Sequence, residues 1–222
     1  MRPYVIINAA MSADGKIATK ERKQLKISGK NDFERVDKLK LDVDAIMVGI
    51  NTVISDNPSL TIKSKENIEA LHLKKKYPIR IVVDSKCRIN INSQILQKGE
   101  GERIILTSKS CDKKNMEKLK KNFRVIVCGE NIVNLKESME ILYNLGIKKL
   151  LVEGGATINY SLIKQELVDE IYTYIGNYII GGSSAPTLVD GSGFLKDEII
   201  KLKLVSFKQI DDGLLVNWTV LY

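Results

Sequence analysis

Residues 150–157 have the sequence Leu150-Leu151-Val152-Glu153-Gly154-Gly155-Ala156-Thr157, in which an apolar run meets two glycines and then a helical pattern. A strand that is apolar on both faces is typical of a parallel sheet covered by helices on two sides. The glycine pair either forms a turn that needs a positive φ or lets the backbone approach a phosphate closely. Glu153 favours the second interpretation, because an acid at the mouth of a buried strand needs a polar partner or a ligand.

Similar apolar runs recur along the chain, with helical patterns between them. The predicted strands are residues 4–11, 44–49, 79–84, 103–107, 124–129, 149–153 and 170–180. The predicted helices are residues 31–41, 113–122, 135–145 and 157–165, the first with Phe33, Val36 and Leu39 at helical spacing. Two last strand patterns, 202–209 and 214–221, flank the turn signal Asp211-Asp212-Gly213. We therefore expect a single α/β domain over residues 1–222, with a mixed, mostly parallel sheet flanked by helices and a C-terminal antiparallel hairpin.

Composition excludes several classes of protein. The chain is 44% apolar and 28% charged, and no apolar run approaches the roughly 18 residues of a membrane helix. Its net charge is +8, but the basic residues are spread out without interleaved aromatics, so we expect no nucleic-acid partner and no membrane. Three cysteines without a Cys-x-x-Cys pair favour a reducing cytoplasm and no metal site. His72 is the single histidine and lies beside a lysine run, so the chemistry belongs to a cofactor, or the chain only binds.

Two further strand ends carry candidate binding residues. After the strand that ends at Gly49, Thr52 and Asp56 are four residues apart and share one face of a short helix. After the strand 79–84, Ser85 stands beside two cations, Lys86 and Arg88, which is what the ribose 2′-phosphate of NADP would need. Capping and solvation explain each of these groups equally well. The G-x-G-x-x-G fingerprint is absent from the sequence, so an ordinary Rossmann enzyme is not supported.

Taken in order, the motifs of this chain resemble the riboflavin-biosynthesis pyrimidine reductases, which have a dihydrofolate-reductase-like fold. The segments that carry the resemblance are Ser12-Ala13-Asp14-Gly15-Lys16-Ile17-Ala18, residues 44–49 with Thr52-Val53, residues 56–61, residues 80–85, Glu153-Gly154-Gly155 and residues 167–170. The resemblance implies NADPH-dependent reduction of 2,5-diamino-6-ribosylamino-4(3H)-pyrimidinone 5′-phosphate to the ribitylamino product. Hydride would reach ribose C1′ of the ring-opened Schiff base.

The resemblance also implies roles for particular residues. The cofactor-binding positions are Ala10, Thr52, Asp56, Val83, Asp84, Ser85, Lys86, Gly154, Gly155, Ala156 and Thr157. The substrate-binding positions are Asn8, Ser28, Lys40, Leu60, Lys63 and Glu153. By charge, Lys40 and Lys63 suit the 5′-phosphate, and Glu153 is the candidate catalytic group for proton movement. Asn8 departs from many bacterial relatives, which carry a lysine there, so a proton-shuttling amine is not expected.

Assembly and substrate are also expectations from the family. A homodimer is expected through the sheet edge or the C-terminal strands, because Tyr172, Tyr174, Tyr178 and the run 171–180 would form a long exposed strand. The sequence lacks the motifs of a zinc deaminase domain. A reductase without that domain resembles the archaeal and fungal arrangement, which favours the diamino substrate. The alternatives are the deaminated 5-amino-6-ribosylaminouracil 5′-phosphate, dihydrofolate, and a nucleotide-binding module without catalysis.

Overall fold

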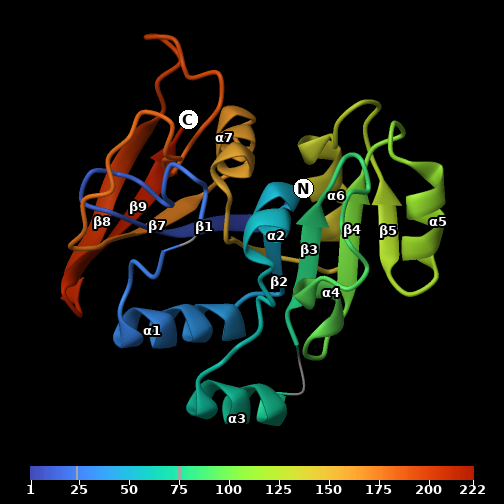
Figure 1. The fold of residues 1–222 in the computed structure, drawn as a ribbon, viewed down its shortest axis with the longest axis horizontal. Coiled ribbons are helices and arrows are strands. Elements are labelled where there is room, and N and C mark those ends of the chain that lie inside the picture. The colour runs from blue at the N-terminus through green and yellow to red at the C-terminus, as the bar shows by residue number, and fades with distance from the viewer. Residues whose placement is uncertain (24, 75–76) are drawn as a thin grey trace. The chain divides into compact units, whose positions relative to one another are not determined.

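The computed structural model describes residues 1–23, 25–74 and 77–222, without the side chain of residue 74 (Figure 1). By its internal contacts the chain forms two compact units. Unit 1 consists of Met1–Tyr4 and Asp37–Leu151, and unit 2 consists of Val5–Val36 and Val152–Tyr222. None of the helices in these described ranges is long and apolar enough to cross a membrane.

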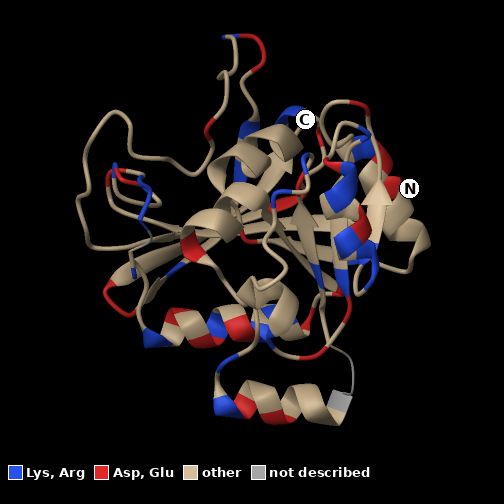
Figure 2. Cartoon of the chain, turned by 45° about the vertical axis from the view of Figure 1, so that its right-hand side comes forward, with Lys and Arg blue, Asp and Glu red and all other residues tan. Residues whose placement is uncertain are grey.

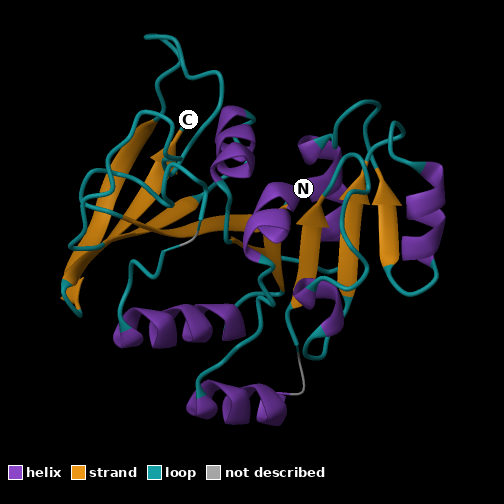
Figure 3. Ribbon diagram, in the orientation of Figure 1, coloured by secondary structure: helices purple, strands orange, loops and turns teal. Residues whose placement is uncertain are grey.

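Unit 1 is built on strands in the order β5-β4-β3-β2-β6, of which β5, β4, β3 and β2 pair in parallel. The strands are β2 (Ala45–Gly49), β3 (Ile79–Val83), β4 (Arg103–Thr107), β5 (Arg124–Val127) and β6 (Lys149–Val152, of which Val152 belongs to unit 2). The central residues of β2, β3, β4 and β6 are buried, as in Ile46, Ile81 and Ile105, which explains why these strands read as continuous apolar runs, whereas the residues of β5 are half-buried or exposed. The adjacent arrows of β3, β4 and β5 point the same way in Figure 3.

Five helices lie wholly within the described part of unit 1, and two of them begin at a polar side chain that caps the first turn. The five are α2 (Ile50–Asp56), α3 (Lys65–Lys74), α4 (Gln94–Gln97), α5 (Lys113–Lys120) and α6 (Leu135–Asn144). Asp112 caps α5 by accepting from the Asn115 amide, and Asn134 caps α6 by accepting from the Glu137 amide. The apolar face of α6 buries Met139 and Leu142 completely. The sequence patterns predicted α5 and α6 but not α3 or α4.

Unit 2 combines one parallel and two antiparallel strand pairs. Its strands are β1 (Tyr4–Met11, of which Tyr4 belongs to unit 1), β7 (Glu170–Ile175), β8 (Lys201–Ile210) and β9 (Gly213–Leu221). β1 pairs with β7 in parallel, β7 pairs with β9 in antiparallel, and β8 forms the expected hairpin with β9. Helix α7 (Ala156–Lys164) also lies in this unit. The predicted hairpin and the parallel first strand are therefore present.

Helix α1 (Lys30–Leu41) buries charged residues rather than its apolar ones. Figure 2 shows acidic and basic residues interspersed along it. Asp32, Asp37 and Lys40 are at most 7% exposed, whereas Phe33 is 47% exposed. The spacing of Phe33, Val36 and Leu39 thus located the helix but did not identify its buried face. Charged residues that stay buried on a helix face indicate a functional or paired role for that face.

The predicted strand 170–180 is wrong in its second half. β7 ends at Ile175, and the amides of Ile180 and Gly181 bond to the carboxylate of Asp14 instead of to a strand. β7 is also an inner strand between β1 and β9, so it is not the exposed strand on which the dimer expectation was based. The exposed edge is β8, whose residues 201–209 are all exposed.

Candidate functional site

The turn between β6 and α7 has the backbone geometry that a close ligand approach requires. Gly154 has a φ of +89°, and a side chain built on it would meet no described atom within 4 Å. Gly155 precedes α7, and no side chain caps the helix there. Ala156 is buried and Thr157 is exposed, both in the first turn. Free N–H groups, a positive helix end and open space beside Gly154 together fit a phosphate group. Glu153, half-buried, stands between this turn and β6.

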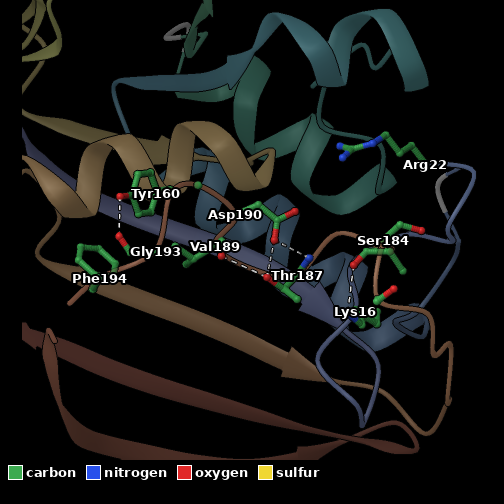
Figure 4. Close-up of a pocket in the computed structure, with 12 residues that line it drawn as sticks. Lys16, Arg22, Tyr160, Ser184, Thr187, Val189, Asp190, Gly193 and Phe194 are labelled. Atoms are coloured by element: carbon green, nitrogen blue, oxygen red, sulfur yellow. Dashed lines mark hydrogen bonds between the residues drawn. The ribbon is translucent and has the colours of Figure 1, made fainter. Parts of the chain in front are cut away.

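A hollow of about 450 Å³ lies in unit 2, lined by residues of the segments 183–194 and 16–22 and by Tyr160 of α7. Figure 4 shows Asp190 and Thr187 pointing toward each other, and the Asp190 carboxylate accepts from the Thr187 hydroxyl at 2.6 Å. The Asp190 amide donates to the Ala156 carbonyl at 3.3 Å, which connects this loop to the first turn of α7. Lys16 Nζ donates to the Ala185 carbonyl and brings a cation to the wall.

Asn8 of β1 contacts a buried ion pair on α1. Arg35 Nη2 donates to Asn8 Oδ1 at 2.8 Å, and Arg35 Nε donates to Asp32 Oδ1 at 2.7 Å. Ala10, which follows Asn8 by two residues on β1, packs against the small apolar cluster of Ile27, Tyr174 and Leu215. Ser28 follows Ile27 and is 9% exposed. These three predicted positions therefore occur in the same unit, Asn8 in a polar environment and Ala10 in an apolar one.

In unit 1 the residues after β3 form a bonded polar group. Ser85 Oγ accepts from the Val133 amide at 3.0 Å, and Lys86 Nζ donates to Ser110 Oγ at 2.9 Å. Ser108 Oγ donates to the Ser85 carbonyl at 2.8 Å, so the segments after β3 and β4 are bonded to each other. Val83 is half-buried at the end of β3. Hydroxyls and an ammonium group at adjacent strand ends suit a bound phosphate ester.

Asp84 has a structural role in this group. It is fully buried, and its carboxylate accepts from the Ile89 amide at 2.8 Å. Burial raises the pKa of Asp84, while the amide bonds and nearby Arg88 oppose that rise. Arg88 Nη2 donates to Asn51 Oδ1 at 3.0 Å, and Arg88 Nε lies 3.9 Å from Asp84 Oδ1. Arg88 and Lys86 are thus both bonded to the protein, Arg88 to Asn51 and Lys86 to Ser110.

Thr52 and Asp56 lie four residues apart on α2, as predicted, and both are half-exposed. The helix follows Gly49 without a side-chain cap, and it ends at Asn57 in the left-handed region. Both side chains of the predicted face are therefore partly open to solvent.

Asp37 contacts both of the predicted phosphate-binding lysines in unit 1, one through its backbone amide and the other through its ammonium group. Its Oδ2 accepts from the backbone amides of Lys63 and Ser64, both at 2.7 Å, and its Oδ1 lies 3.9 Å from Lys40 Nζ. Lys40 is buried, whereas Lys63 is exposed. Leu60 is buried nearby in sequence and has a φ of +55°. One carboxylate thus bonds the main chain at Lys63 and pairs with the ammonium group of Lys40.

The sequence missed several members of these groups. Asp37 and Arg35 both lie on α1, and the charge spacing from Asp32 to Arg35 and from Asp37 to Lys40 was the available signal. Ser108 and Ser110 follow β4, where a hydroxyl-rich segment was visible but not used. Among the described residues there is no cluster of three or more His, Cys, Asp and Glu that could hold a metal.

Sequence comparison gives full-length relatives. A family model described as the RibD C-terminal domain matches residues 3–216. The chain is 43% identical over 219 residues to 2,5-diamino-6-ribosylamino-4(3H)-pyrimidinone 5′-phosphate reductase of Archaeoglobus fulgidus, covering 98% of both chains. It is 41% identical to the protein of the same name from Methanothermobacter thermautotrophicus, covering 99% of both.

Solved structures share the fold at lower identity. The RibD protein of Acinetobacter baumannii superposes with a TM-score of 0.82 at 23% identity, covering 99% of this chain and 58% of that one. The riboflavin biosynthesis reductase Rib7 of Saccharomyces cerevisiae gives a TM-score of 0.74 at 21% identity, covering 99% of this chain and 90% of that one. These matches confirm the expected fold class, an α/β fold with mostly parallel strands and a C-terminal antiparallel hairpin.

Proposed function

Because this chain belongs to the RibD C-terminal domain family, we propose that it is an NADPH-dependent reductase of 2,5-diamino-6-ribosylamino-4(3H)-pyrimidinone 5′-phosphate in riboflavin biosynthesis. The archaeal relatives at 43% and 41% identity carry that name and match over nearly their whole length. The geometric observation that supports the proposal is the β6–α7 turn, where open space beside Gly154 adjoins an uncapped helix start. The product would be the ribitylamino compound.

The nicotinamide cofactor supplies a hydride, and we propose that it is NADPH rather than NADH. The proposed cofactor-binding residues are Ala10, Thr52, Asp56, Val83, Asp84, Ser85, Lys86, Gly154, Gly155, Ala156 and Thr157. Lys86 and the hydroxyls of Ser85, Ser108 and Ser110 would hold the additional phosphate of NADPH by charge and hydrogen bonds. Asp84 would act by fixing the loop that carries Ser85 and Lys86.

The substrate would be recognised through its phosphate and its pyrimidine. Lys40 and Lys63 would bind the 5′-phosphate, and Asp37 would orient them through the contacts described above. The other proposed substrate-binding residues are Asn8, Ser28, Leu60 and Glu153. The buried position of Lys40 keeps part of the phosphate site out of water, which strengthens its attraction for an anion.

We propose that Glu153 handles the proton that the reaction requires. Reduction at ribose C1′ needs an imine, so the glycosylamine must open and its nitrogen must later receive a proton. Glu153 is the acid at the cofactor turn, whereas Asn8 cannot ionise and His72 is exposed with its ring hydrogen-bonded to Tyr77. Glu153 would move the proton directly or through an ordered water.

We further propose that residues 1–222 act as one reductase domain and form a homodimer in the cytoplasm. The exposed strand β8 carries Leu202, Leu204, Val205 and Phe207 at 43–67% exposure, an apolar edge that a second copy would cover. The free and buried thiols of Cys87, Cys111 and Cys128 agree with a reducing compartment. Light scattering at micromolar concentration tests the dimer, and a monomer mass would contradict it.

The function is tested by mixing the purified chain with NADPH and each ribosylaminopyrimidine phosphate in turn. We expect loss of the near-ultraviolet absorbance of NADPH with the diamino substrate, and slower loss with the deaminated one. Faster turnover of the deaminated compound would assign the same chemistry to the other substrate. Turnover of neither compound, with NADPH bound, would contradict the reductase proposal.

A further inference from the structure

Arg35 is held between two polar side chains of unit 2. Its Nε donates to Asp32 Oδ1 at 2.7 Å, and its Nη2 donates to Asn8 Oδ1 at 2.8 Å. The side chain of Asp32 is 3% exposed and that of Arg35 is 17% exposed, so the pair is largely shielded from water. A guanidinium that donates two hydrogen bonds from different nitrogens has little freedom to rotate.

The sheet beneath α1 fixes Arg35 from a third side. Asn8, Tyr172 and Asn217 occupy paired positions on the neighbouring strands β1, β7 and β9. The guanidinium carbon of Arg35 lies 5.7 Å from the centre of the Tyr172 ring, within the range of a cation–π contact. The carboxylate, the amide and the aromatic ring therefore define one position for the guanidinium.

This arrangement determines which way the Asn8 carboxamide faces. Arginine carries only hydrogen-bond donors, so the Asn8 atom that faces it is the carbonyl oxygen. Because the amide group is planar, Nδ2 then points away from the guanidinium. Asn8 consequently offers a ligand N–H donors and keeps its acceptor oxygen for Arg35.

We propose that Arg35 is a positioning residue that makes Asn8 select a hydrogen-bond acceptor on the substrate, either a pyrimidine carbonyl oxygen or a sugar oxygen. The inference rests on the proposed function, since Asn8 is placed on the substrate side by that proposal. Arg35 acts here through Asn8 and takes no part in proton transfer, because its guanidinium stays charged. Without it, the carboxamide would turn freely and present either end.

A double-mutant cycle tests this role. Asp32→Asn/Arg35→Met removes both charges together, so no buried charge is left unpaired, and it is made in the wild-type and in the Asn8→Ala backgrounds. With Asn8 present, we expect the pyrimidine KM to rise about tenfold, with kcat and the NADPH KM changed less than about twofold. With Asn8→Ala, the same pair should change the pyrimidine KM by less than about twofold, because no amide remains to be oriented.

Two single variants give independent readings. Arg35→Lys keeps the charge beside Asp32, but one ammonium group cannot hold both partners as the planar fork does, so the pyrimidine KM should rise by a similar factor. Asn8→Asp keeps an acceptor for Arg35 and removes the N–H donors, so we expect at least about a tenfold higher pyrimidine KM with an unchanged melting temperature. Melting curves and NADPH binding confirm that each variant is folded.

The outcomes separate the inference from the function. Equal KM increases in the two backgrounds, or wild-type KM for Asn8→Asp, would overturn the role of Arg35 while leaving the reductase assignment intact. If folded Asp32→Asn/Arg35→Met is not obtained, Arg35→Lys decides, and a wild-type KM in that variant overturns the role. A wild-type chain that turns over neither pyrimidine would overturn the proposed function, and this inference with it.

Discussion

The carboxylate of Asp211 accepts a hydrogen bond from the backbone amide of Asp32 at 3.1 Å, which ties the turn between β8 and β9 to the start of α1. The amide of Asn31 also donates to Asp211, at 3.4 Å. The first N–H groups of a helix have no partner within the helix, and a negative charge there opposes the positive helix end. A residue 179 positions away in the sequence thus caps the helix that carries Arg35.

Replacing Asp211 should therefore destabilise unit 2. We expect Asp211→Ala to lower the free energy of unfolding by about 1 kcal/mol, the usual cost of losing a helix cap. Asp212→Ala is the matched control, since Asp212 is the exposed neighbour in the same turn. Urea denaturation measures both, and equal losses in the two variants would contradict the capping role.

Lys86 should determine the preference for NADPH. We expect Lys86→Ala to lower kcat/KM for NADPH about tenfold and to leave kcat/KM for NADH nearly unchanged, because the lost contact is charge-assisted. Lys109→Ala is the control, since Lys109 is exposed and bonded to Glu130 at 2.6 Å. Steady-state kinetics with both cofactors checks this. Equal kcat/KM for NADPH and NADH in the wild type would already refute the preference.

Gly154 and Gly146 form a matched pair for testing the cofactor turn. Their φ values are +89° and +90°, and a Cβ on either would meet no described atom within 4 Å. Valine at either position should cost about 1–2 kcal/mol of stability, because an L side chain is strained at positive φ. Only Gly154→Val should also weaken NADPH binding, measured by titration of the folded variant. Normal NADPH affinity in Gly154→Val would leave that glycine with a structural role alone.

Glu153→Gln should separate proton transfer from binding. We expect a normal melting temperature and nearly normal NADPH affinity, with kcat/KM reduced by about 10²–10⁴-fold, as for loss of an acid–base group. Pre-steady-state and steady-state NADPH oxidation would measure it. A raised KM with wild-type kcat at saturating substrate would assign Glu153 to binding only.

Asp14 should make the stability of the protein depend on pH at the acid end. The hydrogen bond from Ser12 and those from the Ile180 and Gly181 amides lower the pKa of Asp14 from 3.8 to about 2. A lowered folded-state pKa stabilises the protein above the unfolded value, and this contribution is lost as the pH falls from about 4 toward about 2. Asp14→Asn should therefore lose less melting temperature than wild type between about pH 5 and about pH 3. Asp197→Asn, at an exposed position, should behave like wild type.

Much of the fold could be predicted because a buried strand has a continuous run of apolar residues in the sequence. Tyr4–Met11 and Arg103–Thr107 were predicted to the residue, and the hairpin β8–β9 followed from Asp211-Asp212-Gly213. The end of β7 at Ile175 was missed although Gly176-Asn177 follows it, because the apolar run resumes at Ile179 and Ile180; the amide of Ile180 is bonded to the distant Asp14 carboxylate instead of to a strand. Hydropathy does not show whether an amide pairs with a strand or bonds to a distant side chain.

The candidate site was predictable where the main chain itself carries the signal, as in the glycines after β6. The contacts made by helix side chains were not predictable in this way. The apolar spacing of Phe33, Val36 and Leu39 located α1 but did not identify its most buried residues, because Asp32 and Asp37 are buried by bonds to Arg35 and to the Lys63 amide. Periodicity counts apolar residues and cannot weigh a bond that compensates a buried charge.

The pairing of β1 with β7 has a consequence for synthesis on the ribosome. Asn8 pairs with Tyr172, so the first strand to emerge is without this neighbour until some three quarters of the chain has been translated. The strands β2, β3 and β4 follow one another closely and pair in sequence, so they can assemble while the rest of the chain is still being made. Until β7 has been made, the apolar strand β1 is exposed. During that time a chaperone would bind it, or it would pair wrongly with another nascent chain.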